Sequence, residues 1–142
     1  MQVFVVGSPL ETARSLDSLR LNKQIVETRQ ILSALKGAKA WNRHPCVLQY
    51  KGHEKWLQHY HDCLLFYKKG NYNLAEIESS YATNCYPVDW HTQEYYDQMK
   101  RRLYTKNPEH YAQWTHLGRS KENWYWSQEL NEFIKYINGK RL

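Results

Sequence analysis

The chain has 142 residues, a net charge of +6 and an aromatic content of 15%. That length is typical of one domain that buries a core without disulfide or metal support, so we expect a single domain over residues 1–142. The N-terminal run lacks the basic region and long apolar stretch of a signal peptide, and no stretch is as long as a membrane span. These features argue against secreted and membrane classes and predict a cytoplasmic protein.

The chain has three cysteines, Cys46, Cys63 and Cys85, and none of them forms a CxxC pair. This odd, scattered set indicates reduced thiols and argues against a disulfide framework or a zinc site. His59 and His61 are two residues apart, so their side chains diverge on a helix. We therefore expect no metal site and no cofactor.

Basic residues gather toward the two ends of the sequence. The net charge is +4 over residues 1–43, −1 over 44–90 and +3 over 91–142. Two basic ends around a near-neutral middle are typical of one positive face, for which a phosphate backbone is the commonest partner. The pattern favours a phosphate backbone, such as that of double-stranded DNA, as the partner, with a soluble basic protein that binds no nucleic acid as the alternative, and charge alone barely decides between the two.

The first third of the sequence predicts a short extended segment and then one long helix. Residues 1–6 are mostly apolar and include three valines, which favour extended structure. The run Ser-Pro-Leu-Glu at 8–11 is a helix start, with serine as the N-cap and proline in the first turn. Apolar residues then recur at helical spacing as far as Leu35, and Gly37 is a stop signal.

Further helices are expected along the rest of the chain. Pro45 opens a second helix that Gly52 kinks or splits, and Gly70 ends it after two lysines. Later helices are expected at 74–80, 92–104 and 126–137, with a short one that Pro108 opens. The sequence thus predicts an all-α fold, a compact single-domain helical bundle with a short extended N-terminal segment.

Polar side chains recur along the expected first helix at spacings of three or four residues: Arg20, Lys23, Glu27 and Gln30. This spacing places them on one side of the helix. One interpretation is a solvated face with a Lys23–Glu27 ion pair worth about 0.2–0.5 kcal/mol. The other is a surface that binds a ligand or carries out chemistry.

Three segments, in this order, resemble the pyrimidine dimer DNA glycosylase (endonuclease V-type) family. The first is RLNKQIVETRQ at 20–30, in which Glu27 follows Lys23 by four residues. The second is WNRHP at 41–45 followed by YKKG at 67–70, and the third is His91 leading to KNPEHY at 106–111. The resemblance is closer still to short bacterial and phage relatives of that family.

The resemblance implies a protein that kinks DNA, flips a nucleotide out of the duplex and attacks C1′ of its sugar with an amine. The attack expels the base and leaves an imine, and Glu27 matches the carboxylate that assists ring opening and β-elimination. In well-characterised members the amine belongs to a small residue exposed when the initiator Met is removed. Here Gln2 is bulky, which disfavours that removal. Three nucleophiles stay open: the α-amine of Met1, the ε-amine of Lys23, and a water activated by Glu27.

The same segments supply the expected DNA-binding residues: Arg20, Gln30, Asn42, Arg43, His44 and His91. We therefore expect a monomeric base-excision enzyme, a DNA glycosylase with or without abasic-site lyase activity, that acts on a damaged or modified pyrimidine by base flipping. One alternative is a non-catalytic DNA-binding module on the same fold. Another is an enzyme that modifies free bases or nucleotides, which would need a closed pocket lined by Trp and Tyr.

Overall fold

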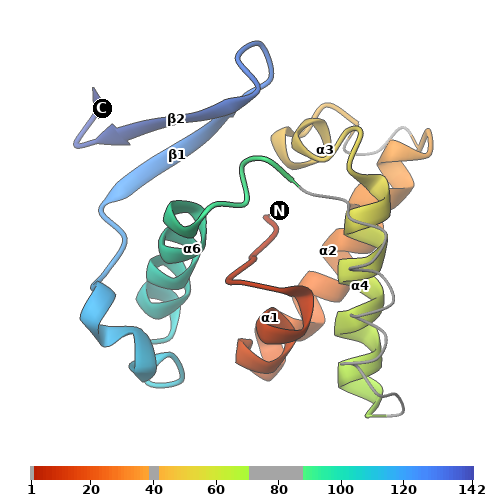
Figure 1. The fold of residues 1–142 in the computed structure, drawn as a ribbon, viewed down its shortest axis with the longest axis horizontal. Helices are drawn as coiled ribbons and strands as arrows, with labels where there is room; N and C mark the ends of the chain where they lie inside the picture. Colours follow the sequence, from red (N-terminus) through yellow and green to blue (C-terminus); the bar gives the residue numbers. More distant parts are fainter. Residues whose placement is uncertain (1, 39–41, 71–87) are drawn as a thin grey trace. The chain divides into compact units, whose positions relative to one another are not determined.

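The computed structural model describes residues 2–38, 42–70 and 88–142. The chain forms two compact units, Met1–Asp89 and Trp90–Leu142, and Figure 1 shows the elements of each. The expectation of one domain over the whole chain stays a prediction. The helix expected at 74–80 lies outside the described residues, as does Cys85.

The N-terminal unit begins with an extended segment that is enclosed by the rest of the unit. Residues 3–6 are at most 5% exposed. Side chains bind the backbone of this segment: Val6 N–H donates to Thr12 Oγ1 at 3.1 Å, and Phe4 N–H donates to Gln24 Oε1 at 2.9 Å. The predicted extended segment is confirmed, and it forms part of the core.

Two helices, α1 (Pro9–Ser15) and α2 (Ser18–Leu35), follow where one long helix is expected. The helix start is as predicted, because Ser8 Oγ accepts the N–H of Glu11 at 3.1 Å. The single long helix is wrong, because Leu16 has an extended backbone and ends α1. Asp17 then stands at the N-cap of α2, a position that aspartate favours, although its side chain makes no capping hydrogen bond.

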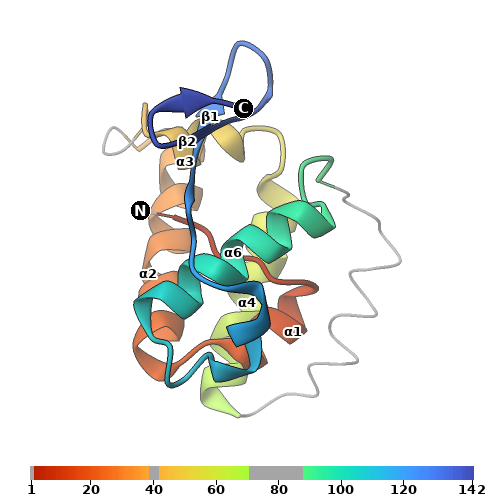
Figure 2. The same cartoon turned by 90° about the vertical axis from the view of Figure 1, so that its left-hand side faces the viewer.

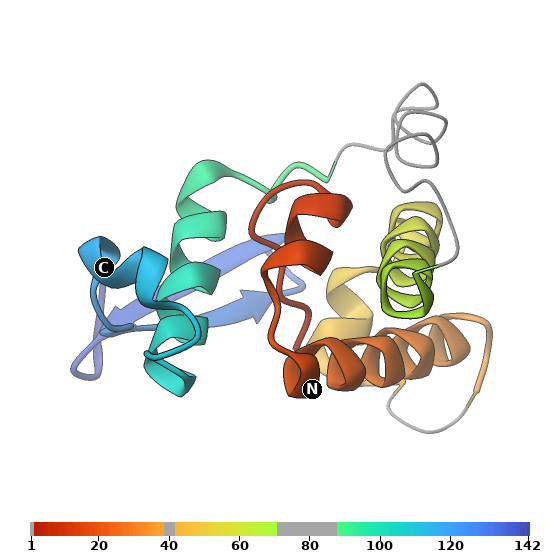
Figure 3. The ribbon, with the colours of Figure 1, turned by 90° about the horizontal axis from the view of Figure 1, so that it is seen from below.

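Among the described residues of this unit, two further helices follow, α3 (Pro45–Gln49) and α4 (Glu54–Lys69). The predicted split at Gly52 is confirmed, since Gly52 has a φ of +90° between the two helices. Gly70 ends α4 in the left-handed conformation, as its position after two lysines predicts. Helix α4 packs against α1 and α2, and Figure 3 views it almost along its axis with α2 passing beside it.

The C-terminal unit begins with α6 (Gln93–Lys106), which confirms the helix expected at 92–104. Thr92 is its N-cap, and Thr92 Oγ1 accepts the N–H of Tyr95 at 3.2 Å. The short helix that Pro108 is expected to open begins four residues later, as the 3-10 helix η1 (Ala112–Leu117) after a turn at 108–111, and it packs against α6 (Figure 2).

The chain ends in a three-stranded antiparallel sheet, which makes the all-α prediction wrong. Its strands are β1 (Glu122–Ser127), β2 (Glu132–Ile137) and β3 (Lys140–Arg141), in the order β1-β2-β3. The helix expected at 126–137 does not form, because most of that stretch pairs as a hairpin with the residues before it. The fold is therefore mixed, with helices in both units and the sheet in the second.

Two local signals explain the hairpin. In β1, Trp124 is 8% exposed and its neighbour Tyr125 is 59% exposed, the alternation of a strand with one packed face. Between β2 and β3, Asn138 and Gly139 have φ of +50° and +78°, as a two-residue turn of type I′ requires. None of the helices in the described residues is long and apolar enough to cross a membrane.

Candidate active-site groove

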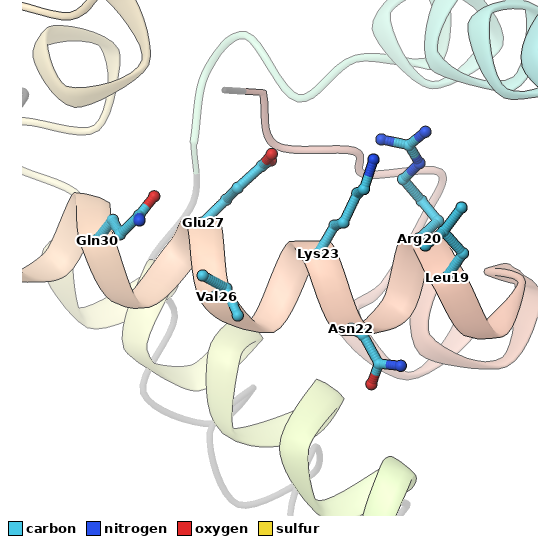
Figure 4. A pocket seen from close by; sticks show the side chains of 7 residues that line it. All are labelled: Leu19, Arg20, Asn22, Lys23, Val26, Glu27 and Gln30. Atoms are coloured by element: carbon cyan, nitrogen blue, oxygen red, sulfur yellow. The ribbon is translucent and has the colours of Figure 1, made fainter.

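An open groove of about 450 Å³ runs along α2 in the N-terminal unit. Its walls are Leu19, Arg20, Asn22, Lys23, Val26, Glu27 and Gln30 (Figure 4). The structure thus brings together all four polar residues that the helical spacing places on one face. Glu27 is half-buried, whereas Lys23 and Gln30 are exposed.

Lys23 and Glu27 do not form the ion pair that a solvated helix face would have with this spacing. In the part of the chain that the structure describes, the ion pairs join His61 to Asp62 and Lys135 to Glu94, and none joins Lys23 to Glu27. Figure 4 shows the side chains of Lys23 and Glu27 extending from the same side of the helix. The carboxylate of Glu27 is engaged elsewhere.

Glu27 is held by the N-terminal segment. Its Oε2 accepts the backbone N–H of Gln2 at 3.3 Å and the side-chain Nε2–H of Gln24 at 3.2 Å. Two N–H donors on one oxygen fix the direction of the carboxylate. The start of the chain and the predicted catalytic carboxylate are therefore brought within hydrogen-bonding distance by the fold.

Gln24 is the residue that sets this arrangement. It is 0% exposed, and its amide bridges the segment much as a neighbouring strand would. Its Oε1 accepts the N–H of Phe4, and its Nε2 donates to the carbonyl of Gln2 at 2.6 Å. The hydroxyl of Tyr60 on α4 donates to the carbonyl of Phe4 and lies 3.1 Å from Gln24 Oε1.

The sequence prediction did not include Gln24 among the site residues. The signal that could have found it is its place on the helix, because Leu21, Ile25 and Thr28, at spacings of one, three and four residues, are all buried. A glutamine on a buried face needs hydrogen-bonding partners there.

Arg20 lies beside the same segment at the other end of the groove. Its guanidinium carbon is 5.4 Å from the centroid of the Phe4 ring, a cation–π arrangement. Arg20 thus covers a core aromatic ring while keeping a positive charge at the groove.

His44 stands at the N-cap of α3, which packs against α2. Its Nδ1 accepts the N–H of Cys46 at 3.1 Å, so in the neutral ring the proton lies on Nε2. Burial lowers the pKa of His44, while the charge of Glu27 acts in the opposite direction. The structure therefore places His44 within electrostatic range of Glu27.

The other predicted residues are not part of the groove wall. Asn42 and Arg43 are exposed just before α3. His91 belongs to the C-terminal unit, where it stacks on Tyr95 with the ring centroids 5.4 Å apart. Met1 lies outside the described residues. Within the described residues, no group of three or more His, Cys, Asp or Glu side chains could hold a metal ion.

A family model described as pyrimidine dimer DNA glycosylase matches residues 1–67. The resemblance to this family is thereby confirmed. The match covers the N-terminal segment, Glu27 with the whole of α2, and most of α4, and it ends before the C-terminal unit. Neither the search of curated proteins nor that of solved structures finds a match. At the level of the family, the match supports a DNA repair glycosylase and hence DNA binding.

Proposed function

We propose that the protein is a DNA glycosylase that removes a damaged or modified pyrimidine, with Glu27 as the catalytic carboxylate and the α-amine of Met1 as the nucleophile. The observation that carries this proposal is the 3.3 Å contact between the N–H of Gln2 and Oε2 of Glu27. Covalent geometry alone keeps the nitrogen of residue 1 about 3–4 Å from that of residue 2. We therefore propose that the amine of residue 1 can reach the carboxylate of Glu27.

Acid–base chemistry favours an α-amine over a lysine for this task. An α-amine has an ordinary pKa near 7.7–8.0 and a lysine amine one near 10.4, so at pH 7.5 about a third of α-amines and about 0.1% of lysine amines carry a free electron pair. The free base is the form that attacks. Lys23 is the alternative nucleophile, on the same helix face one turn from Glu27.

The proposed reaction follows the chemistry of the family. The amine nitrogen bonds to C1′ as the bond from C1′ to the base breaks, and the carboxylate of Glu27 stabilises the positive charge that develops on the sugar. Glu27 then takes a proton from the attached amine and delivers it to the ring oxygen. The sugar opens and a protonated imine remains, from which β-elimination can break the strand.

The walls of the groove suit a flipped nucleotide. Leu19 and Val26 are 61% and 51% exposed, and such aliphatic side chains can cover the face of a base. Arg20 brings a cation for a phosphate. We propose that Gln30 and His44 contact the nucleotide and that Asn42, Arg43 and His91 bind flanking DNA.

The shape of the groove argues against an enzyme for free bases or nucleotides. Such an enzyme is expected to enclose its substrate in a pocket with aromatic walls. The groove along α2 is open, and none of its walls is aromatic. An open groove fits a substrate that stays attached to a duplex.

The test is borohydride trapping on duplexes that carry either an abasic site or a pyrimidine dimer. Intact mass first establishes that the purified chain has a free amino terminus at Met1. We expect a covalent adduct that peptide mapping places on residue 1, and we expect the adduct to persist in Lys23→Ala. Glu27→Gln should lower the rate of base release by about 10²–10⁴-fold, whereas Glu129→Gln, which removes an exposed carboxylate outside the groove, is the matched control and should leave the rate unchanged.

Other outcomes would each identify a different function. An adduct mapped to Lys23 would identify Lys23 in place of Met1 as the nucleophile, and the glycosylase activity would still stand. Base release with no adduct would indicate a water activated by Glu27. Duplex binding with neither adduct nor base release, unchanged by Glu27→Gln, would contradict the proposal and leave the non-catalytic module.

A further inference from the structure

A second hollow, of about 290 Å³, lies wholly within the C-terminal unit. It lies between α6 and the segment that joins η1 to β1, and its walls include Gln98, Arg101, Gly118, Arg119, Lys121 and Glu122. None of these residues belongs to the family match or to the groove along α2. Its volume is at the lower end of the range for small-molecule sites, roughly 300–1,000 Å³.

The walls of this hollow are strongly positive. They carry three cations, Arg101, Arg119 and Lys121, and none of the three forms an ion pair with a carboxylate among the described residues. The nearby carboxylate, Glu122, accepts the indole N–H of Trp124 at 2.6 Å. Three cations against the one carboxylate leave the walls with a net charge of +2, which suits an anion.

The segment that bears two of these cations is fixed by hydrogen bonds to α6. Ser120 N–H donates to Thr105 Oγ1 at 2.9 Å, and Gln98 Nε2 donates to Ser120 Oγ at 3.0 Å and to the carbonyl of Glu122 at 3.2 Å. Both ends of the short run 120–122 are thus anchored to one helix. A wall held in this way needs little reorganisation when a ligand arrives.

The two arginines are also oriented. Arg101 uses its Nε–H on the carbonyl of Leu117 at 3.1 Å, one of the five donors of a guanidinium. The guanidinium carbon of Arg119 lies 5.7 Å from the centroid of the Tyr104 ring. Arginines whose planes are held in this way bind phosphate with two parallel hydrogen bonds.

We propose that this hollow is a phosphate-binding site, with Arg101 and Arg119 as bidentate donors and Lys121 as a third cation. The phosphate is either a phosphodiester of a DNA backbone or the phosphate of a small molecule. The proposal does not depend on Glu27 or on any reaction in the groove.

The test compares two double variants of the full chain that remove the same charge. The pocket variant is Arg119→Gln with Lys121→Gln, and the control is Lys106→Gln with Lys140→Gln, whose lysines are exposed in the same unit outside the hollow. Arg101 is left intact because it supports the fold. Binding to an undamaged duplex is measured over a range of salt concentrations, and ¹⁵N spectra are recorded with inorganic phosphate and with a nucleoside monophosphate.

If the ligand is a phosphate of the DNA backbone, the pocket variant should bind the duplex more weakly than the control does. The slope of log K against log salt should also become shallower by about 0.9 for each DNA phosphate that the variant no longer neutralises. If the ligand is a small-molecule phosphate, the nucleoside monophosphate should shift the amide signals of Gly118 and Arg119 in the wild type and the control but not in the pocket variant. The slopes of log K against log salt for duplex binding should then be equal in the two variants. Equal behaviour of both variants in every measurement would overturn the proposal. Because no measurement involves catalysis, that outcome is independent of the glycosylase test.

Discussion

Two extended regions among the described residues form the hydrogen bonds of their backbones in different ways. The backbone of the N-terminal segment, residues 2–6, is hydrogen-bonded to side chains, those of Gln24, Thr12, Tyr60 and Glu27. The hairpin of β1 and β2 is bonded through six paired positions of backbone. The first region depends on a few specific side chains from other parts of the sequence. The second depends on backbone N–H and C=O groups, which do not require particular side chains.

This difference has a consequence for what each region can do. A strand held by backbone hydrogen bonds tolerates most substitutions on its exposed face. Its position therefore does not depend on any single side chain. A segment held by side chains is sensitive to each of them, and in return its end is placed closely against Glu27. The second arrangement suits a chain start that takes part in chemistry.

The largest effect is expected from Gln24→Leu. The change removes the partners of the Phe4 N–H and the Gln2 carbonyl, so we expect the free energy of unfolding to fall by about 2–5 kcal/mol. Urea unfolding followed by tryptophan fluorescence measures it. Tyr60→Phe, which removes one donor from the same network, should cost about 1–2 kcal/mol.

The control for this prediction is Gln30→Leu on the exposed side of the same helix. A surface change of this kind should stay within about 0.5 kcal/mol of the wild type. Equal losses for Gln24→Leu and Gln30→Leu would show that the segment is not held by the buried amide, and the comparison with the hairpin would fail.

A smaller effect is expected from Gly139→Ala in the turn between β2 and β3. The glycine has a φ of +78° and open space where a Cβ would lie, so the cost is conformational strain alone, about 1 kcal/mol. Thermal unfolding measures it, and Asn138→Gly is the matched control, because glycine accepts the φ of +50° without strain. A loss of several kcal/mol would mean that the hairpin is as sensitive to one residue as the N-terminal segment.

The smallest effect concerns pH. Because burial lowers the pKa of His44 below its ordinary 6.5, the unfolded chain binds the proton more readily than the native one. His44 therefore contributes stability that is present above pH 6.5 and is lost as the pH falls through its native pKa. Since the side chain is half-exposed, we expect a shallow slope.

This slope is measured as the difference in unfolding free energy between the wild type and His44→Asn from pH 8 to pH 5. Asparagine is a good N-cap, so the substitution keeps the helix start while removing the titration. The other histidines are common to both proteins and cancel. The unfolding free energy of the wild type minus that of His44→Asn should fall as the pH falls, and a rise in this value would contradict the burial of His44.

The sequence was informative at most of the helix boundaries that carry a local signal. The start of α1, the split at Gly52, the end of α4 at Gly70 and the start of α6 all follow from residues within a turn of the boundary. The polar face around Glu27 follows from helical spacing alone. Such features need no knowledge of what packs against the helix.

The sequence failed where the outcome depends on distant partners. Gln24 gains its role from Phe4, twenty residues away, and spacing cannot reveal which segment will cross the helix. In the last stretch, Trp126, Phe133 and Ile137 fit a helical period as well as a strand, and the sequence prediction overlooked the local Asn-Gly turn signal at 138–139. Pairing with β1 then decides the structure.

The burial of residues 3–6 also bears on how the protein can be joined to others. Gln2 contacts the carboxylate of Glu27, so a polypeptide fused ahead of residue 1 would begin beside that carboxylate. At the other end, Leu142 is 65% exposed and follows a short edge strand. Affinity tags and fused domains therefore belong at the C-terminus, and an uncleaved N-terminal tag should produce a folded protein with an obstructed groove.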